Sequence, residues 1–154
     1  MRCWILSIAI LFATGGLLAA ETTERVRFDH VALTVRDVDA TVRFYQAVFG
    51  LEEIVNRTEI EGIRWLALDE GRELHLISGF GEPPEPVKTV HFALAAPDFD
   101  AFIAGLESAG IAYETWPGEA AQVTIRADGT RQVYLQDPNG YWIEVNGAPA
   151  AAAR

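Results

Sequence analysis

Apolar and polar positions follow the same pattern twice along the chain. The stretch FDHVAL at residues 28–33 returns as TVHFAL at residues 89–94. Each copy begins with an alternating apolar run, typical of a strand, and continues with the apolar spacing of a helix. The helical pattern stops at Gly50 in the first copy and at Gly110 in the second. This self-similarity indicates that one supersecondary unit is used twice.

The first copy predicts a strand, a helix and three further strands. The first strand is expected over residues 26–35, and Asp37 or Asp39 supplies the N-cap of a helix that ends at Gly50. The helix shows its apolar face at Val38, Val42, Tyr45 and Phe49. Three β-like runs follow, separated by Glu-Gly turns, at residues 51–60, 63–69 and 73–78.

The second copy predicts the same order of elements. A strand over residues 87–95 precedes a helix that opens at Pro97-Asp98 and stops at Gly110. Extended segments are expected at residues 111–115, 122–126, 131–136 and 141–145, with the tight turn DPNG at 137–140 before the last one. We therefore expect an α+β domain in which two βαβββ modules form a curved mixed sheet around a cleft. Module one covers residues 26–79, a Gly- and Pro-rich linker 80–86, and module two 87–146.

Length and charge narrow the choice of partners. The chain has 154 residues and a formal charge of −10, which suits one compact domain, expected over residues 21–148. A nucleic acid or an anionic membrane surface would require a basic patch, so the acidic balance argues against both. The charge by itself does not identify the partner.

The first 20 residues have the pattern of a signal peptide. Arg2 precedes an uncharged apolar run that ends in small residues before Glu21. We expect a protein exported to the periplasm or secreted, with no stable membrane association after cleavage; an uncleaved N-terminal anchor is the alternative. Cys3, the only cysteine, lies in this segment, so the mature domain has no disulfide. The tail at residues 147–154 has no packing pattern and is expected to be loose.

The signal-peptide interpretation predicts the N-terminus of the exported protein. It should begin near Glu21, and N-terminal sequencing of protein recovered from outside the cytoplasm measures this directly. An intact Met1 on cytosolic protein would contradict it.

The histidines occupy matched places in the two copies. The chain contains three histidines: His30 and His91 on the first strands, and His75 on the last strand of copy one. Glu144 takes the corresponding place on the last strand of copy two, between apolar neighbours. A lone strand histidine is usually structural, but here every histidine falls on a first or last strand. Three imidazoles and a carboxylate suit one divalent transition metal, such as Zn, Ni, Fe, Co or Mn.

Several motifs together resemble the vicinal oxygen chelate superfamily. They are the FDHVALTV start, the helix ending FYQAVFGLE, the second start HFAL and the finish VYLQDPNGYWIEV, over about residues 26–146. The superfamily includes glyoxalase I, methylmalonyl-CoA epimerase, fosfomycin resistance proteins, extradiol dioxygenases and bleomycin-resistance binding proteins. The resemblance implies metal ligands at His30, His75, His91 and Glu144, and a substrate that chelates the metal through adjacent oxygens. It also implies a cleft formed within one chain or between the chains of a homodimer.

The departures from known members limit the choice of activity. Thr34 stands where bacterial glyoxalase I has a glutathione-binding arginine, and Ala32 stands where fosfomycin resistance proteins have a threonine. We expect a glyoxalase-like lyase or isomerase, with Glu144 as the catalytic base. An extradiol-type dioxygenase, or a protein that only binds and sequesters a small molecule, is the alternative.

Other residues are weaker candidates for binding. Arginines on predicted strands could anchor an anionic substrate, although such residues are more often solvated: Arg57, Arg64, Arg126 and Arg131. Aromatic residues could line an apolar pocket, although packing in the core or on a sheet is their commoner role: Trp65, Trp116, Tyr134 and Trp142.

Overall fold

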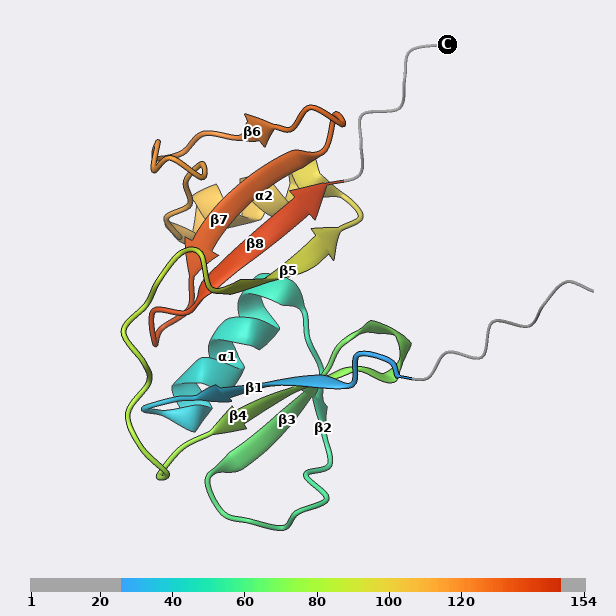
Figure 1. Cartoon of the computed structure of the whole chain (residues 1–154), viewed down its shortest axis with the longest axis vertical. Coiled ribbons are helices and arrows are strands. Elements are labelled where there is room, and N and C mark those ends of the chain that lie inside the picture. Colours follow the sequence, from blue (N-terminus) through green and yellow to red (C-terminus); the bar gives the residue numbers. More distant parts are fainter. Residues whose placement is uncertain (1–25, 148–154) are drawn as a thin grey trace, which may run out of the picture.

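The two repeats fold into two similar modules. The structure is a computed structural model that describes residues 26–147. Module one contains β1 (His30–Thr34), α1 (Val38–Phe49), β2 (Glu53–Ile54), β3 (Ile63–Ala67), the short 3-10 turn η1 (Asp69–Gly71) and β4 (Glu73–Ile77). Module two contains β5 (His91–Ala96), α2 (Phe99–Ala109), β6 (Thr124–Ile125), β7 (Arg131–Gln136) and β8 (Trp142–Gly147). Figure 1 shows the modules one above the other.

Each module has its own four-stranded mixed sheet. The strand orders are β1-β4-β3-β2 and β5-β8-β7-β6. The first and last strands of each module are parallel neighbours, whereas the other pairs are antiparallel. The α+β class and the two βαβββ modules are thus confirmed, and the eight strands are divided between two sheets. The parallel pairing brings His30 beside His75 and His91 beside Glu144.

One face of each sheet is covered by its helix. Leu33, Leu66, Leu74 and Leu76 are buried in module one, and Val133, Leu135, Ile143 and Val145 in module two, all within one hydrophobic cluster that spans both modules. Because side chains alternate along a strand, His30 and His75 lie on the opposite face of the first sheet, and His91 and Glu144 on the opposite face of the second. We call these two surfaces the ligand-bearing faces.

Both helices begin and end as the sequence predicts. Asp37 and Asp98 are the N-caps. Each side chain accepts a hydrogen bond from the backbone N–H of the residue three positions later, Ala40 or Ala101. Gly50 and Gly110 end the helices in the left-handed region, with φ of 66° and 67°. The matched caps show that the duplication extends to local hydrogen bonding.

Several predicted strands are shorter and one is absent; the extended segment expected at residues 122–126 is a strand only at Thr124–Ile125. The run at residues 51–60 is a strand only at Glu53–Ile54, because Asn56 turns the chain with hydrogen bonds to Ile60 and Ile63. Residues 111–115 form no strand and pair only through two isolated bridges at Glu114, to Ala120 and to Tyr134. Apolar alternation therefore predicted extended backbone there, but no continuous neighbour is available to pair with it.

The DPNG turn of module two is hydrogen-bonded to module one. Asn139 Oδ1 accepts from the Arg36 backbone N–H (2.9 Å), and Asn139 Nδ2 donates to Thr41 Oγ1 (3.0 Å). The Tyr45 hydroxyl donates to Asp137 Oδ2 (3.3 Å). Burial raises the pKa of Asp137, although its hydrogen bonds from the turn oppose the shift. We call this group of contacts the DPNG latch; it fixes the position of one module against the other.

The predicted signal peptide and the predicted loose tail lie outside the described residues, except for Gly147, which is not loose but is the last residue of β8. Within residues 26–147, no helix has the length and apolar character needed to cross a bilayer. The expected export therefore stays a prediction.

The latch predicts a large stability effect at Asn139. Asn139→Ala should lower the free energy of unfolding by about 2–3 kcal/mol, because the Arg36 N–H and the Thr41 hydroxyl both lose a buried partner. Urea denaturation followed by circular dichroism measures this loss. Gln136→Ala is the matched control, since its exposed amide bonds only Gly140 in the same turn; an equal loss in both variants would contradict the latch.

Candidate functional site

The two histidines of module one form a stack with a tryptophan. His75 lies between Ala32 and Trp65 in the strand register. Its ring stacks on that of His30 with centroids 4.3 Å apart, and on that of Trp65 with centroids 4.2 Å apart. The indole of Trp65 is 8% exposed, so it fixes the orientation of His75 from the side away from His30.

Carboxylates set the protonated nitrogen of both histidines in module one. His30 Nδ1 donates to Asp29 Oδ2 (2.7 Å), which leaves Nε2 with its lone pair. His75 Nε2 donates to Glu73 Oε2 (2.8 Å), which leaves Nδ1 with the lone pair. A carboxylate behind a histidine is the arrangement that orients metal-bound imidazoles. Glu73 is on the same face as His75 and is a further oxygen donor beside the pair.

The histidine of module two faces a carboxylate. His91 Nδ1 lies 2.8 Å from the Lys88 carbonyl oxygen, and since a carbonyl can only accept, this nitrogen carries the proton. The other nitrogen, Nε2, lies 3.1 Å from Glu144 Oε2. In a neutral imidazole both of these atoms are acceptors, so their approach is favourable only with a proton or a cation between them.

Neighbouring side chains hold both oxygens of Glu144. The Tyr134 hydroxyl donates to Oε2 and Asn146 Nδ2 donates to Oε1, each at 2.6 Å. Burial alone would raise the pKa of Glu144, but these hydrogen bonds and the nearby His91 outweigh it, so the pKa lies below its ordinary value. Burial and the bond to Glu144 raise the pKa of Tyr134, which stays a donor. Glu144 is therefore an oriented, ionised carboxylate.

The two modules place equivalent residues at equivalent register positions. His75 pairs with Ala32 on one side and Trp65 on the other, and Glu144 pairs with Ala93 and Tyr134 in the same way. His30 and His91 are the first residues of β1 and β5. The repeated unit thus builds a first-strand histidine, a last-strand donor and an aromatic neighbour twice.

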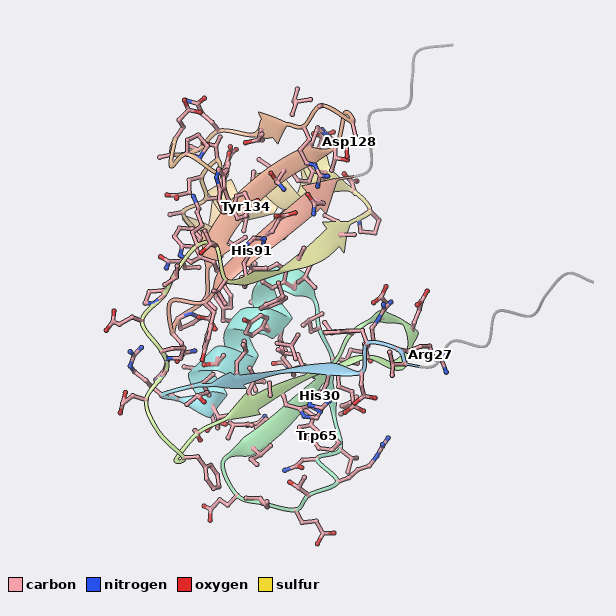
Figure 2. All side chains as sticks on the ribbon, in the orientation of Figure 1. Arg27, His30, Trp65, His91, Asp128 and Tyr134 are labelled. Atoms are coloured by element: carbon pink, nitrogen blue, oxygen red, sulfur yellow. The ribbon has the colours of Figure 1, made fainter. Side chains whose placement is uncertain are left out.

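The four predicted ligands are divided into two pairs in the chain. We call His30 with His75 half-site one, and His91 with Glu144 half-site two. Figure 2 shows His30 and Trp65 on one sheet and His91 and Tyr134 on the other. Within residues 26–147, no group of three or more His, Cys, Asp or Glu side chains is arranged to hold a metal ion. The four-ligand site therefore stays a prediction, which the two half-sites would have to complete together.

The aromatic candidates all belong to the ligand-bearing faces or their rims. Packing on the sheet is the observed role of Trp65 and Tyr134, which are 8% and 3% exposed. Trp116, in contrast, is 44% exposed beside His91. Trp142 lies next to Glu144 in the register of β8 and packs under Lys88. Trp65 and Tyr134 could be named from the sequence because they lie on predicted strands. No sequence pattern indicated a role for Lys88.

Three of the four arginine candidates, all but Arg57, form ion pairs among the described residues. Arg64 bonds Asp39 and Glu53, and Arg131 bonds Asp100. Arg126 bonds Asp128 at the exposed turn before β7. These three cations are engaged in ion pairs, and the charge of Arg126 also acts on Tyr134, where it opposes the rise in the pKa of the hydroxyl.

Comparison with known proteins identifies a family and a common fold. The sequence model of the glyoxalase/bleomycin resistance protein/dioxygenase superfamily matches residues 27–145. An uncharacterized protein of Bacillus subtilis, YwbC, is 29% identical over 77% of this chain and 94% of its own. The virulence protein STM3117 of Salmonella typhimurium is 27% identical over 78% and 83%.

Solved structures share the fold at low sequence identity. The oxidase ChaP-H2 superposes with a TM-score of 0.67 at 22% identity, covering 85% of this chain and all of its own. The fosfomycin resistance protein FosX of Listeria monocytogenes gives a TM-score of 0.62 at 19% identity, covering 80% and 93%. At these identities the likeness concerns the fold alone.

The hydrogen bond to Glu144 predicts a measurable role for one hydroxyl. Tyr134→Phe should lower the free energy of unfolding by about 1–2 kcal/mol, because a buried carboxylate loses a donor at 2.6 Å. Urea denaturation at neutral pH measures it. Tyr113→Phe is the control, since its hydroxyl bonds Glu107 on the edge of α2; the prediction is wrong if the two variants lose the same amount.

Proposed function

Since the chain belongs to the glyoxalase/bleomycin resistance protein/dioxygenase superfamily, we propose that it is a metal-dependent enzyme of the glyoxalase-like lyase or isomerase kind. Its substrate is a small molecule that reaches one divalent transition metal through two adjacent oxygens. The observation that carries this proposal is the 3.1 Å approach of His91 Nε2 to Glu144 Oε2. Both atoms can coordinate one divalent cation through their lone pairs.

The donor set supports a transition metal. Each first-strand histidine presents Nε2, because its Nδ1 is bonded to Asp29 or to the Lys88 carbonyl. Three imidazoles and one carboxylate are ligands suited to Zn, Ni, Fe, Co or Mn. His75 would use Nδ1, or would release Glu73 and use Nε2. When bound, such a metal supplies a Lewis acid that polarises a carbonyl oxygen.

The proton-transfer role falls to Glu144. Its low pKa keeps it ionised, and a carboxylate in this state can take a proton from the carbon next to a carbonyl. Tyr134 and Asn146 fix its two oxygens, so the direction of the transfer is set before substrate arrives. These residues act as orienting groups, and Glu144 as the base.

We propose that a homodimer completes the site. The DPNG latch and the shared hydrophobic cluster fix the two modules of one chain against each other. Bringing the two half-sites of one chain together would require breaking that arrangement. A second copy related by a two-fold axis can instead face half-site one of one chain with half-site two of its partner, and symmetry then forms two equal sites.

Metal content of single variants tests the ligand set. His91→Ala and Glu144→Ala should each weaken metal binding by more than about 100-fold, since even an outer-shell partner is worth about 10- to 100-fold. Elemental analysis after dialysis against competing chelator gives the metal per chain. Glu85→Ala removes an exposed carboxylate from the linker and should keep the native content.

Mixing two inactive variants tests the dimer. A copy with His30→Ala and His75→Ala lacks half-site one, and a copy with His91→Ala and Glu144→Ala lacks half-site two. Refolding them together in equal amounts should restore about a quarter of the native metal content and activity, because about half of the dimers are mixed and each has one intact site. No restoration, with both variants folded, would place the site within one chain. A native protein that holds no metal would instead favour a binding protein.

A further inference from the structure

We propose that Trp116 forms one side of a subsite, beside half-site two, that binds a planar aromatic ring by stacking. The proposal rests on the exposed indole of Trp116, which lies next to the rings of His91 and Tyr134. The inference rests on the proposed function, because it names the substrate class for the same site. It concerns a residue outside the four predicted ligands.

The indole of Trp116 stands upright beside the two rings. Its centroid lies 6.0 Å from that of His91 and 5.4 Å from that of Tyr134, at interplanar angles of 63° and 60°. Both ring pairs are of the edge-to-face type, and the side chain of Trp116 remains 44% exposed. A wall of this kind leaves aromatic surface available next to the atoms that would bind the metal.

The segment that carries Trp116 is held in place. Glu114 and Tyr134 exchange two backbone hydrogen bonds of 2.9 and 2.8 Å, which attach the segment to β7. The Thr115 N–H donates to the Glu119 carbonyl at 3.0 Å and closes the following turn. The exposed indole is thus on a fixed support, and a ligand that stacks on it has little ordering of the loop to overcome.

Lys88 holds the segment at residues 114–116 with three hydrogen bonds. Its Nζ donates to Glu114 Oε1 (2.5 Å) and to the carbonyls of Thr115 (2.7 Å) and Trp116 (3.0 Å). All three donors of the ammonium group are therefore used. The group also lies 4.6 Å from the centroid of the Trp142 ring. Lys88 has no donor left for a ligand, so its role is to position Trp116.

An exposed tryptophan on a fixed support offers apolar area that a ligand can cover. A large aromatic side chain gains free energy from burial, and leaving one in water gives up that gain. Tyr134, the counterpart of Trp65 in the strand register, is 3% exposed, and Trp65 itself is stacked on His75 and almost fully covered. Trp116 is therefore the exposed aromatic side chain beside half-site two, and a flat unsaturated ring is the group that fits against it.

Calorimetric titration with three probes tests the subsite. In metal-loaded protein, 4-nitrocatechol offers adjacent oxygens on an aromatic ring, and acetohydroxamate offers adjacent oxygens without one. Trp116→Leu should weaken nitrocatechol binding about three- to tenfold and leave acetohydroxamate binding and metal content unchanged. Trp116→Phe should recover most of the loss because it keeps a ring. Phe80→Leu changes an exposed aromatic residue of the linker and should alter the binding of neither nitrocatechol nor acetohydroxamate.

A third probe separates this proposal from the metal proposal. In metal-stripped protein, 4-nitrophenol has the ring and no chelating pair, so its weaker binding should still fall in Trp116→Leu. If metal never binds but nitrophenol keeps this dependence, the proposed function fails and the stacking subsite stands. Equal losses for nitrocatechol and acetohydroxamate, no loss for either aromatic probe, or no binding of them to the native protein would overturn the subsite.

Discussion

The hydrogen bonds of the DPNG latch determine how the two modules lie against each other. Asn139 and Asp137 belong to module two, and each finds its partners on or beside α1 of module one. These groups are buried, so leaving any of them without a partner is costly. The latch therefore fixes the relative placement of the two ligand-bearing faces, and through it the way in which two half-sites can meet.

The strand alternation then decides which chemistry each face carries. Apolar residues at alternate strand positions pack on α1 and α2, and the histidines occupy the positions in between, so they lie on the opposite face. The hydrogen bonds behind His30 and His91 fix which nitrogen presents a lone pair. A histidine's place on the strand and one hydrogen bond at its Nδ1 are therefore sufficient to present the lone pair of its Nε2 on the ligand-bearing face.

The sequence predicts the elements more fully than it predicts how they meet. The helices, with the caps at Asp37 and Asp98, follow from local rules and agree with the structure. The pairing of His30 with His75 and of His91 with Glu144 follows from the repeat. The latch role of Asn139 could not be predicted, because a turn motif does not reveal a contact about 100 residues away. Lys88 was missed because its three bonds depend on where a non-repetitive segment returns.

The parallel pairing of first and last strands has a consequence for how the protein matures. His30 and His91 gain their neighbours only after the whole module has been made, because β4 and β8 are the last strands of their modules. Parallel contacts between distant parts of a chain form late in folding. A nascent chain with only its first strands in place has isolated imidazoles and no paired donors. Capture of the proposed metal ion before folding is complete is therefore disfavoured.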